Sequence, residues 1–265
     1  MYQERPASLP GAVRWSSVAP VGATPTRVLP DGCLDLLWSS RAGLLVAGPD
    51  RTAYLSVVAP GDRWVGLRLP PGVGPAVVGV PADELRDRRV SLADLWGQAA
   101  AERVARLVAD GVAPIPPRAG DRTGWAVGAP PAARVGPAGA ANHPAPETVA
   151  SVLEAVAVER LRRAGGPDPV GRRVAARLAA GATVAATAAE VGLGARALHR
   201  RCRHLFGYGP KTLARILRMR RALDLARAGT PLAEVAARAG YADQAHLTRD
   251  VRALTGLPPR ALLYP

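Results

Sequence analysis

The stretch AARAGYADQAHLTRDVRALTGLPP, residues 236–259, repeats an earlier stretch of the same chain, AAEVGLGARALHRRCRHLFGYGP, residues 188–210. Ala188 and Gly192 match Ala236 and Gly240 at a spacing of 48 residues. After one extra residue in the second copy, the spacing becomes 49. So many matched positions with a single slip identify a duplicated unit. The pairs at the longer spacing are Leu198 with Leu247, Arg200 with Arg249, Cys202 with Val251, Leu205 with Leu254, Gly207 with Gly256, and Pro210 with Pro259.

Each copy of the unit has the pattern of two helices joined by a tight turn. The matched glycine, Gly192 or Gly240, suits the left-handed conformation that ends a helix. A second helix then begins, with Asp243 as a good N-cap in the second copy and Gly194 as a weaker one in the first. The apolar residues of this helix recur at i, i+4 and i+7, which turns one face inward. The pattern predicts a helix-turn-helix, whose second helix enters the DNA major groove.

Hydrogen-bonding side chains lie off the packed stripe, near the start of each predicted second helix. Arginine pairs with guanine and glutamine with adenine, and each good pair contributes about 1–3 kcal/mol of discrimination. Arg203 lies further along the first helix and is expected at a phosphate or in solvent. His246 is either a reading residue or is tucked against its own turn. The predicted DNA-binding residues are Arg196, His199, Arg200 and Arg203 in the first unit, and Gln244, Ala245, Thr248 and Arg249 in the second.

The segment between the two units, PKTLARILRMRRALDLARAG, is expected to form one helix over about residues 210–228. At 1.5 Å per residue it would be about 28 Å long. That approaches the roughly 34 Å between successive major-groove faces on one side of a duplex. One chain could therefore place two reading helices on DNA.

The positive charge of the chain is concentrated in its last hundred residues. The formal net charge is +1 over residues 1–110, +2 over 111–166 and +11 over 167–265. A basic C-terminal segment is typical of a polyanion binder. The expected partner is double-stranded DNA.

Composition changes along the chain predict two domains of α+β class. Short apolar runs between Gly, Pro and Asp predict a β-rich domain over residues 1–112, including a helix at 91–109 that begins with the N-cap Ser91. A Gly/Pro/Ala-rich linker is expected over 113–146 and a helical connector over 147–166. Residues 167–265 are expected to be all-helical. Dimerisation through the helix at 91–109 or the one near 147–163 is an open alternative.

Several classes of function lack their signals in this sequence. The first histidine is His143, so the N-terminal domain has no set of ligands for a cupin-type metal site. No nucleophile, nucleotide-binding or metalloprotease motif occurs, and no apolar run approaches a membrane span. Cys33 and Cys202 form no paired framework. We therefore expect a cytoplasmic, nucleoid-associated protein that is not an enzyme and needs no metal or cofactor.

The duplicated unit resembles the DNA-binding domain of the AraC/XylS family of bacterial transcription regulators. The resemblance implies seven helices with two helix-turn-helix units on a long connecting helix, and contact with RNA polymerase. LPDGCLDLLW, VAGPD and VGLRLPPGVGPAVVGVPADELRDRRVSLADLWG resemble an N-terminal domain found fused to such modules in actinobacteria. The family commonly places a cupin-like β-barrel there, which senses a small-molecule effector or dimerises. Where the family often has an aromatic and a basic residue, this chain has Val251 and Arg252.

Asp35 is the most informative residue of the N-terminal part. In CLDLLW, strand alternation places Cys33, Asp35 and Leu37 on one face. If this face is inward, the carboxylate needs a partner, because an unpaired buried charge is costly, and Arg68 is the candidate. The pair is either a structural ion pair or part of an effector site. Two alternatives to a sequence-specific regulator remain: a nonspecific architectural DNA-binding protein, and an alkyl-acceptor or stress sensor that uses Cys33.

Overall fold

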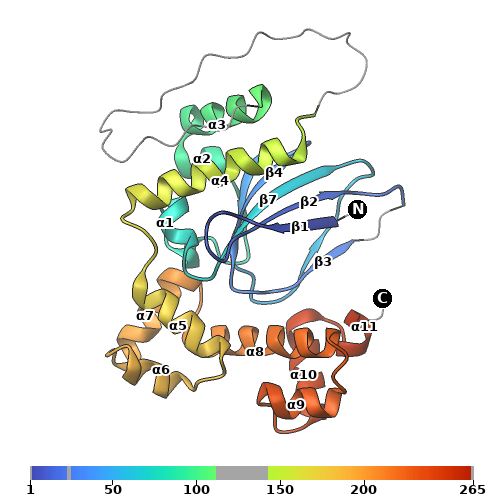
Figure 1. The fold of residues 1–265 in the computed structure, drawn as a ribbon, viewed down its shortest axis with the longest axis vertical. Helices are drawn as coiled ribbons and strands as arrows, with labels where there is room; N and C mark the ends of the chain where they lie inside the picture. Colours follow the sequence, from blue (N-terminus) through green and yellow to red (C-terminus); the bar gives the residue numbers. More distant parts are fainter. Residues whose placement is uncertain (1, 23–24, 112–142, 264–265) are drawn as a thin grey trace.

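The computed structural model describes residues 2–22, 25–111 and 143–263 (Figure 1). These residues form two hydrophobic cores, one in a β-rich N-terminal domain and one in a helical C-terminal domain. This confirms the predicted α+β class. Of the predicted linker, residues 113–142 lie outside the described residues.

The N-terminal domain is built on a six-stranded antiparallel sheet in the order β1-β2-β7-β4-β5-β8. A separate two-stranded sheet pairs β3 with β6. The described strands therefore form open sheets, with β1 and β8 at the edges of the larger one, and no single closed barrel. The strands are β1 Tyr2–Pro6, β2 Val13–Val18, β3 Thr26–Val28, β4 Leu34–Ser39, β5 Gly43–Ala47, β6 Tyr54–Ser56, β7 Arg63–Leu69 and β8 Arg89–Ser91.

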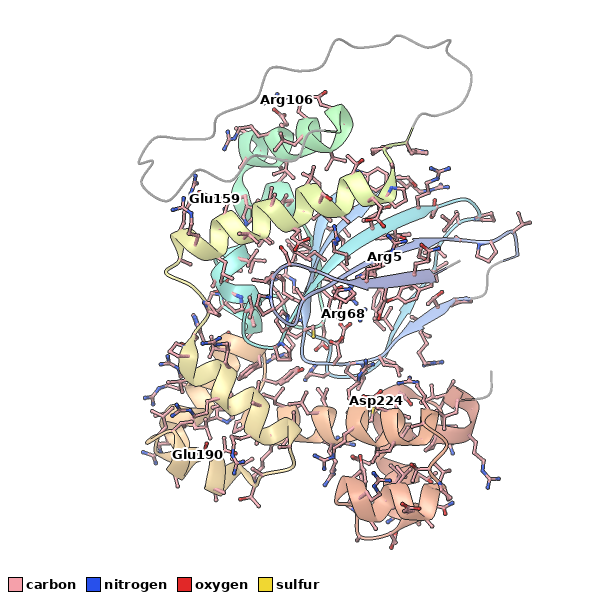
Figure 2. The ribbon with its side chains drawn as sticks, in the orientation of Figure 1. Arg5, Arg68, Arg106, Glu159, Glu190 and Asp224 are labelled. Carbon is pink, nitrogen blue, oxygen red and sulfur yellow. The ribbon has the colours of Figure 1, made fainter. Side chains whose placement is uncertain are left out.

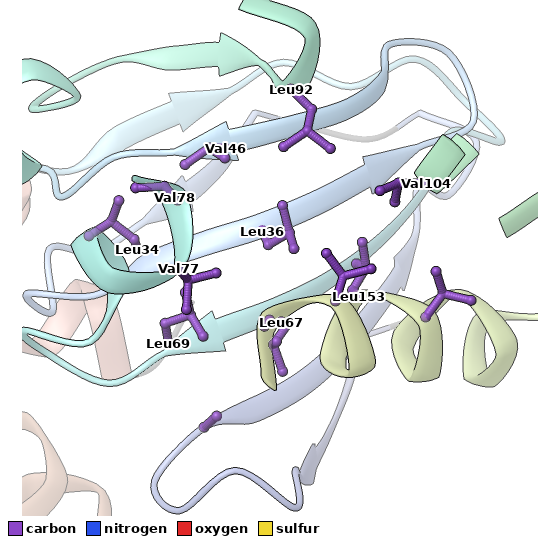
Figure 3. Close-up of a cluster of buried hydrophobic side chains, with 14 of the residues drawn as sticks. Leu34, Leu36, Val46, Leu67, Leu69, Val77, Val78, Leu92, Val104 and Leu153 are labelled. Atoms are coloured by element: carbon purple, nitrogen blue, oxygen red, sulfur yellow. The ribbon is translucent and has the colours of Figure 1, made fainter. Parts of the chain in front are cut away.

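The two faces of the larger sheet have different chemistry because successive side chains on a strand alternate. Leu34 and Leu36 on β4, and Leu67 on β7, are at most 1% exposed and pack against helices (Figure 3). Burying a leucine side chain fully contributes about 1.5–3 kcal/mol. Asp35 lies on the opposite face, called the polar face below, where the charged Asp35 and Arg68 lie among apolar side chains such as Leu37.

Helices cover the apolar face of the sheet (Figure 1). The predicted helix at 91–109 is interrupted at Gly97, whose φ of 81° and ψ of 153° are not helical. Its N-cap is confirmed, since the backbone N–H of Asp94 donates to Ser91 Oγ at 3.1 Å. The helical elements are α1 Gly74–Val78, the 3-10 turn η1 Ala82–Glu84, α2 Leu92–Trp96, α3 Gln98–Asp110 and α4 Pro146–Arg163.

Helix α4 covers most of residues 147–166, the range predicted to form a helical connector. Its residues Val149, Val152, Leu153 and Val156 are at most 3% exposed and join the core of the N-terminal domain. Glu154, 8% exposed, accepts hydrogen bonds from the backbone of Ser8 and Leu9. This part of the chain therefore packs as an element of the N-terminal domain.

The described part of the C-terminal domain has seven helices, α5 to α11, as the family resemblance implies. Asp168 caps α5, because its Oδ1 accepts from the backbone N–H of Gly171 at 2.6 Å. The long connecting helix α8 runs without a break beneath the N-terminal domain (Figure 1). The helices are α5 Pro169–Ala179, α6 Val184–Glu190, α7 Ala195–Phe206, α8 Pro210–Arg227, α9 Leu232–Ala239, α10 Gln244–Thr255 and α11 Pro259–Leu263.

Candidate nucleic-acid interface and interdomain cavity

The second helix-turn-helix unit consists of α9 and α10. Gly240, with φ of 80°, ends α9 in the left-handed conformation, as predicted. Asp243 caps α10, because its Oδ1 accepts from the backbone N–H of His246 at 2.6 Å. Leu247, Val251 and Leu254 are at most 2% exposed, so the predicted inward stripe is confirmed.

The predicted reading residues of α10 lie at its free N-terminal end. Gln244, Ala245 and Arg249 are exposed. Thr248 is half-buried, and its hydroxyl donates to the backbone oxygen of Gln244 at 2.9 Å. His246 packs edge-on against Tyr241 with ring centroids 5.1 Å apart, which supports its role in the turn. The first two turns of α10 thus present an amide and a guanidinium to solvent.

The first unit consists of α6 and α7. Arg196, His199 and Arg200 are exposed on α7, above the buried Leu198 and Cys202. The His199 ring lies against the backbone of Gly209, where an added Cβ would come within 2.6 Å of His199 Cε1. Both units therefore expose basic or amide groups near the start of their second helix.

Arg203 does not join these residues. Its Nη2 lies 2.7 Å from Asp83 Oδ2 in the N-terminal domain. An ion pair between residues 120 positions apart is not readable from a local pattern. Phosphate binding by Arg203 would require this pair to open.

A charged cluster around Asp250 was not anticipated from the sequence. The Asp250 side chain is 7% exposed and accepts from Arg215 Nε at 2.5 Å, from Arg218 Nη2 at 3.2 Å and from Tyr241 OH at 3.1 Å. The Arg218 guanidinium also lies 4.3 Å from the centroid of the Tyr241 ring. Burial and the Asp250 carboxylate raise the pKa of Tyr241 to about 12. The cluster ties α10 to α8, and its one sequence signal is an acidic residue in a strongly basic region.

A cavity of about 620 Å³ lies between the polar face of the larger sheet, the two-stranded sheet and the C-terminal domain. Register places Arg68, Asp35, Ala47 and Arg89 in one row across β7, β4, β5 and β8. Aromatic and apolar side chains cover the rest of the wall. They include Tyr2, Trp15, Leu37, Leu45, Tyr54, Val58 and Trp64 from the N-terminal domain, and Leu257, Ala261 and Leu262 from the C-terminal domain.

Arg68 is the partner of Asp35, as strand alternation suggests. Arg68 is labelled in Figure 2. Its Nε lies 3.6 Å from Asp35 Oδ1 and 3.4 Å from Asp31 Oδ2, and its Nη1 lies 3.0 Å from Glu4 Oε1. Gly66 leaves room for the Trp15 indole, whose Nε1 donates to Asp35 Oδ1 at 2.7 Å. One guanidinium therefore serves three carboxylates on the cavity wall.

Burial controls the ionisation of this wall. Burial raises the pKa of Asp35 to about 6, although the Arg68 guanidinium and the Trp15 hydrogen bond lower it. Burial lowers the pKa of Arg68, but the Asp35 and Asp31 carboxylates outweigh it, so the net direction is upward. Arg68 stays charged, while Asp35 titrates nearer to neutrality than an ordinary aspartate.

Cys33 is poorly suited to act as a nucleophile. Burial, followed by the Asp31 and Asp35 carboxylates, raises the pKa of its thiol well above the ordinary value. Because the thiolate is the reactive form, this environment suppresses alkyl transfer. It argues against the alkyl-acceptor alternative.

No group of three or more His, Cys, Asp and Glu among the described residues could hold a metal ion. No helix of the described chain is both long enough and apolar enough to cross a membrane.

Comparison with known proteins assigns a family to each domain. Residues 187–263 match a family described as a helix-turn-helix domain, and residues 12–91 match a domain of unknown function, DUF6597. No curated protein matches the chain.

Several solved structures are similar to the chain at low sequence identity. A probable AraC family transcriptional regulator from Rhodopseudomonas palustris CGA009 is 24% identical over 36% of this chain and 95% of its own, with a TM-score of 0.32. ToxT from Vibrio cholerae O395 is 8% identical over 99% of this chain and 97% of its own, with a TM-score of 0.45. ToxT bound to (E)-4-(8-methylnaphthalen-1-yl)but-3-enoic acid gives 8% identity, 99% and 98% coverage, and a TM-score of 0.45.

The duplicated unit, its inward stripes and the matched segments lead to one assignment. Residues 187–263, which contain most of the duplicated unit, belong to a helix-turn-helix domain family, and residues 12–91 belong to a domain family with no assigned function.

Proposed function

We propose that the protein is a sequence-specific transcription regulator that reads two adjacent major-groove segments, one with α7 and one with α10. The observation that carries the proposal is the pair of equivalent helices whose first two turns expose basic or amide side chains. Arg200 and Arg249 occupy matched positions, and a bidentate arginine–guanine contact supplies base discrimination. Arginines elsewhere on the domain would bind phosphates, which makes the affinity strongly salt-dependent. Contact with RNA polymerase belongs to the same proposal.

The cavity supports control of this activity by a small molecule. Its volume of about 620 Å³ lies within the usual range for ligand pockets, and its wall combines aromatic surface with a few charged groups. Arg220 of α8 lines it as well and adds a positive charge to the wall. Trp64 Nε1, also at the wall, is buried without a hydrogen-bond partner in the described structure. We infer an effector with an apolar body and hydrogen-bond acceptors.

Selection of binding sites from random DNA by the full chain tests the readout. The expected result is one bipartite motif. Arg200→Ala should weaken base preference in one half of it and Arg249→Ala in the other, each by about 1–3 kcal/mol. Arg252→Ala is the matched control, since it removes the same charge from an exposed position further along α10 and should lower affinity without changing the motif.

A salt-dependent affinity without any selected motif would instead favour the architectural alternative.

Native mass spectrometry of the protein from its own host tests whether the cavity holds a small molecule. A bound small molecule should be detected with the natural chain and lost from an Ala47→Phe variant, which places a ring in the cavity. Equal retention by both chains would contradict an effector at this position.

A further inference from the structure

The N-terminal domain contacts the two reading helices at equivalent points, namely their C-terminal ends. Gly207 ends α7 and Gly256 ends α10, and these glycines are matched in the duplication, with φ of 82° and 78°. An added Cβ would come within 2.6 Å of Pro49 Cγ at Gly207 and within 3.0 Å of Arg27 Nη1 at Gly256. Each glycine therefore permits a close approach by the other domain as well as a left-handed turn.

An arginine of the N-terminal domain donates to a terminal carbonyl of each helix. Arg86 Nη1 donates to the backbone oxygen of Gly207 at 2.9 Å, and Arg27 Nη1 donates to that of Thr255 at 2.7 Å. Helix C-termini carry partial negative charge and unpaired carbonyls, so a guanidinium there is favourable. The backbone N–H of Ala53 adds a bond of 2.7 Å to the oxygen of Leu254. The two contacts are alike in chemistry and position.

The two contacts differ in whether their arginine lines the cavity. Arg27 lines the cavity, whereas Arg86, Asp83 and Pro49 do not. The C-terminal residues that line it are Arg220 and Arg227 of α8, together with Leu257, Ala261 and Leu262 beyond α10. No described residue of α5, α6 or α7 lines it. No described residue of α9 or α10 lines it either, so the contents of the cavity reach the second unit through Arg27, which donates to Thr255, and through the segment that follows α10.

We infer that Arg27 and Arg86 are positioning residues for the second and first reading helices, and that the cavity acts on DNA through the second unit alone. This inference rests on the proposed function. A molecule in the cavity changes the surroundings of Arg27 and of the segment after α10. It leaves the Arg86 contact with α7 unchanged.

The test uses the full chain and three DNA duplexes: the selected operator, the operator with the α7 half scrambled, and the operator with the α10 half scrambled. Arg27→Ala should weaken binding roughly fivefold or more wherever the α10 half is intact, in the range of ordinary coupling between sites. It should have no effect when that half is scrambled. Arg86→Ala should show the mirror pattern, and Arg27→Lys, which keeps a charged donor, should recover part of the loss.

Because the effector is unidentified, a bulky side chain that fills the cavity takes its place in this experiment. Ala47→Phe lies on the larger sheet and Ser56→Phe on the two-stranded sheet, so the two variants place a ring in the cavity from different walls; circular dichroism and melting temperature check that each folds. Each should alter affinity on the same two duplexes as Arg27→Ala. Equal changes through both halves, or no change in either folded variant, would overturn the inference. A natural chain without sequence preference would instead refute the proposed function.

Discussion

The two helix-turn-helix units share their apolar frame but differ in what holds the second helix in place. In the first unit Arg201, matched to Asp250, forms an exposed ion pair with Asp168 at the start of α5. In the second unit Asp250 is buried among Arg215, Arg218 and Tyr241. The first unit has no side-chain N-cap on its second helix, whereas the second has Asp243. Duplication preserved the packing positions, while the polar contacts diverged with their surroundings.

The largest expected loss of stability comes from truncating the buried apolar residues that the two units share. Leu198→Ala and Leu247→Ala each remove a side chain that is 1% exposed, and each should lower the free energy of unfolding by about 2–5 kcal/mol. Urea unfolding followed by circular dichroism at helical wavelengths measures it. Tryptophan fluorescence does not, because no tryptophan lies beyond residue 125. Losses that differ severalfold would show that the frames are not equivalent.

Replacing the buried Asp250 should cost more stability than the matched change in the first unit. Asp250→Asn leaves two arginines without their shared anion and should lower the free energy of unfolding by about 1.5–3 kcal/mol, because both arginines keep some access to water. Arg201→Ala, the matched change in the first unit, should cost less than about 1 kcal/mol. The same denaturation experiment compares them. Equal losses would remove the distinction between the two polar contacts.

A third comparison replaces the N-cap residue of the second helix in each unit. Asp243→Ala should cost about 1 kcal/mol because the N–H of His246 loses its acceptor. Gly194→Ser should stabilise the chain by about 0.5 kcal/mol, since φ of −67° and ψ of 158° suit any residue and nothing lies within 4 Å of an added Cβ. Thermal melts of both variants measure the two shifts. A destabilised Gly194→Ser chain would show that the first unit needs its glycine.

The smallest expected effect concerns His246, whose counterpart in the first unit is Ala197. His246→Ala removes the ring contact with Tyr241 and an acceptor 3.4 Å from the backbone N–H of Ala242. The expected cost is about 0.5 kcal/mol, with no change in the selected DNA motif. Binding-site selection beside a thermal melt checks both. A changed base preference would make His246 a reading residue.

The sequence predicted those features that depend on residues close together in the chain. The stripe through Leu247 and Val251, the cap at Asp243 and the left-handed Gly240 depend on residues within one turn or two, so the sequence alone indicates them. Strand alternation likewise placed Asp35 opposite the apolar face. The prediction that most of 147–166 connects the domains did not anticipate that α4 packs into the N-terminal core. An apolar stripe shows that a helix is buried but not which surface covers it.

Apart from the pair of Asp35 with Arg68, the contacts between distant segments were not predicted. Arg203 with Asp83, and Arg27 with Thr255, join residues far apart in the chain. Their side chains have no periodicity that marks them as partners. The break at Gly97 was missed because a single glycine within an apolar repeat is compatible with a helix.

The unbroken helix α8 has a consequence for the spacing of DNA sites. Its 18 residues span about 27 Å as a rigid rod, and the Asp250 contacts with Arg215 and Arg218 fix the second unit to it. In the proposed binding mode, the second unit is held at a high effective concentration near one position on the duplex once the first unit is bound. That advantage depends on helical phase. Moving the halves apart by half a turn of DNA should abolish it, whereas a flexible tether would tolerate the change.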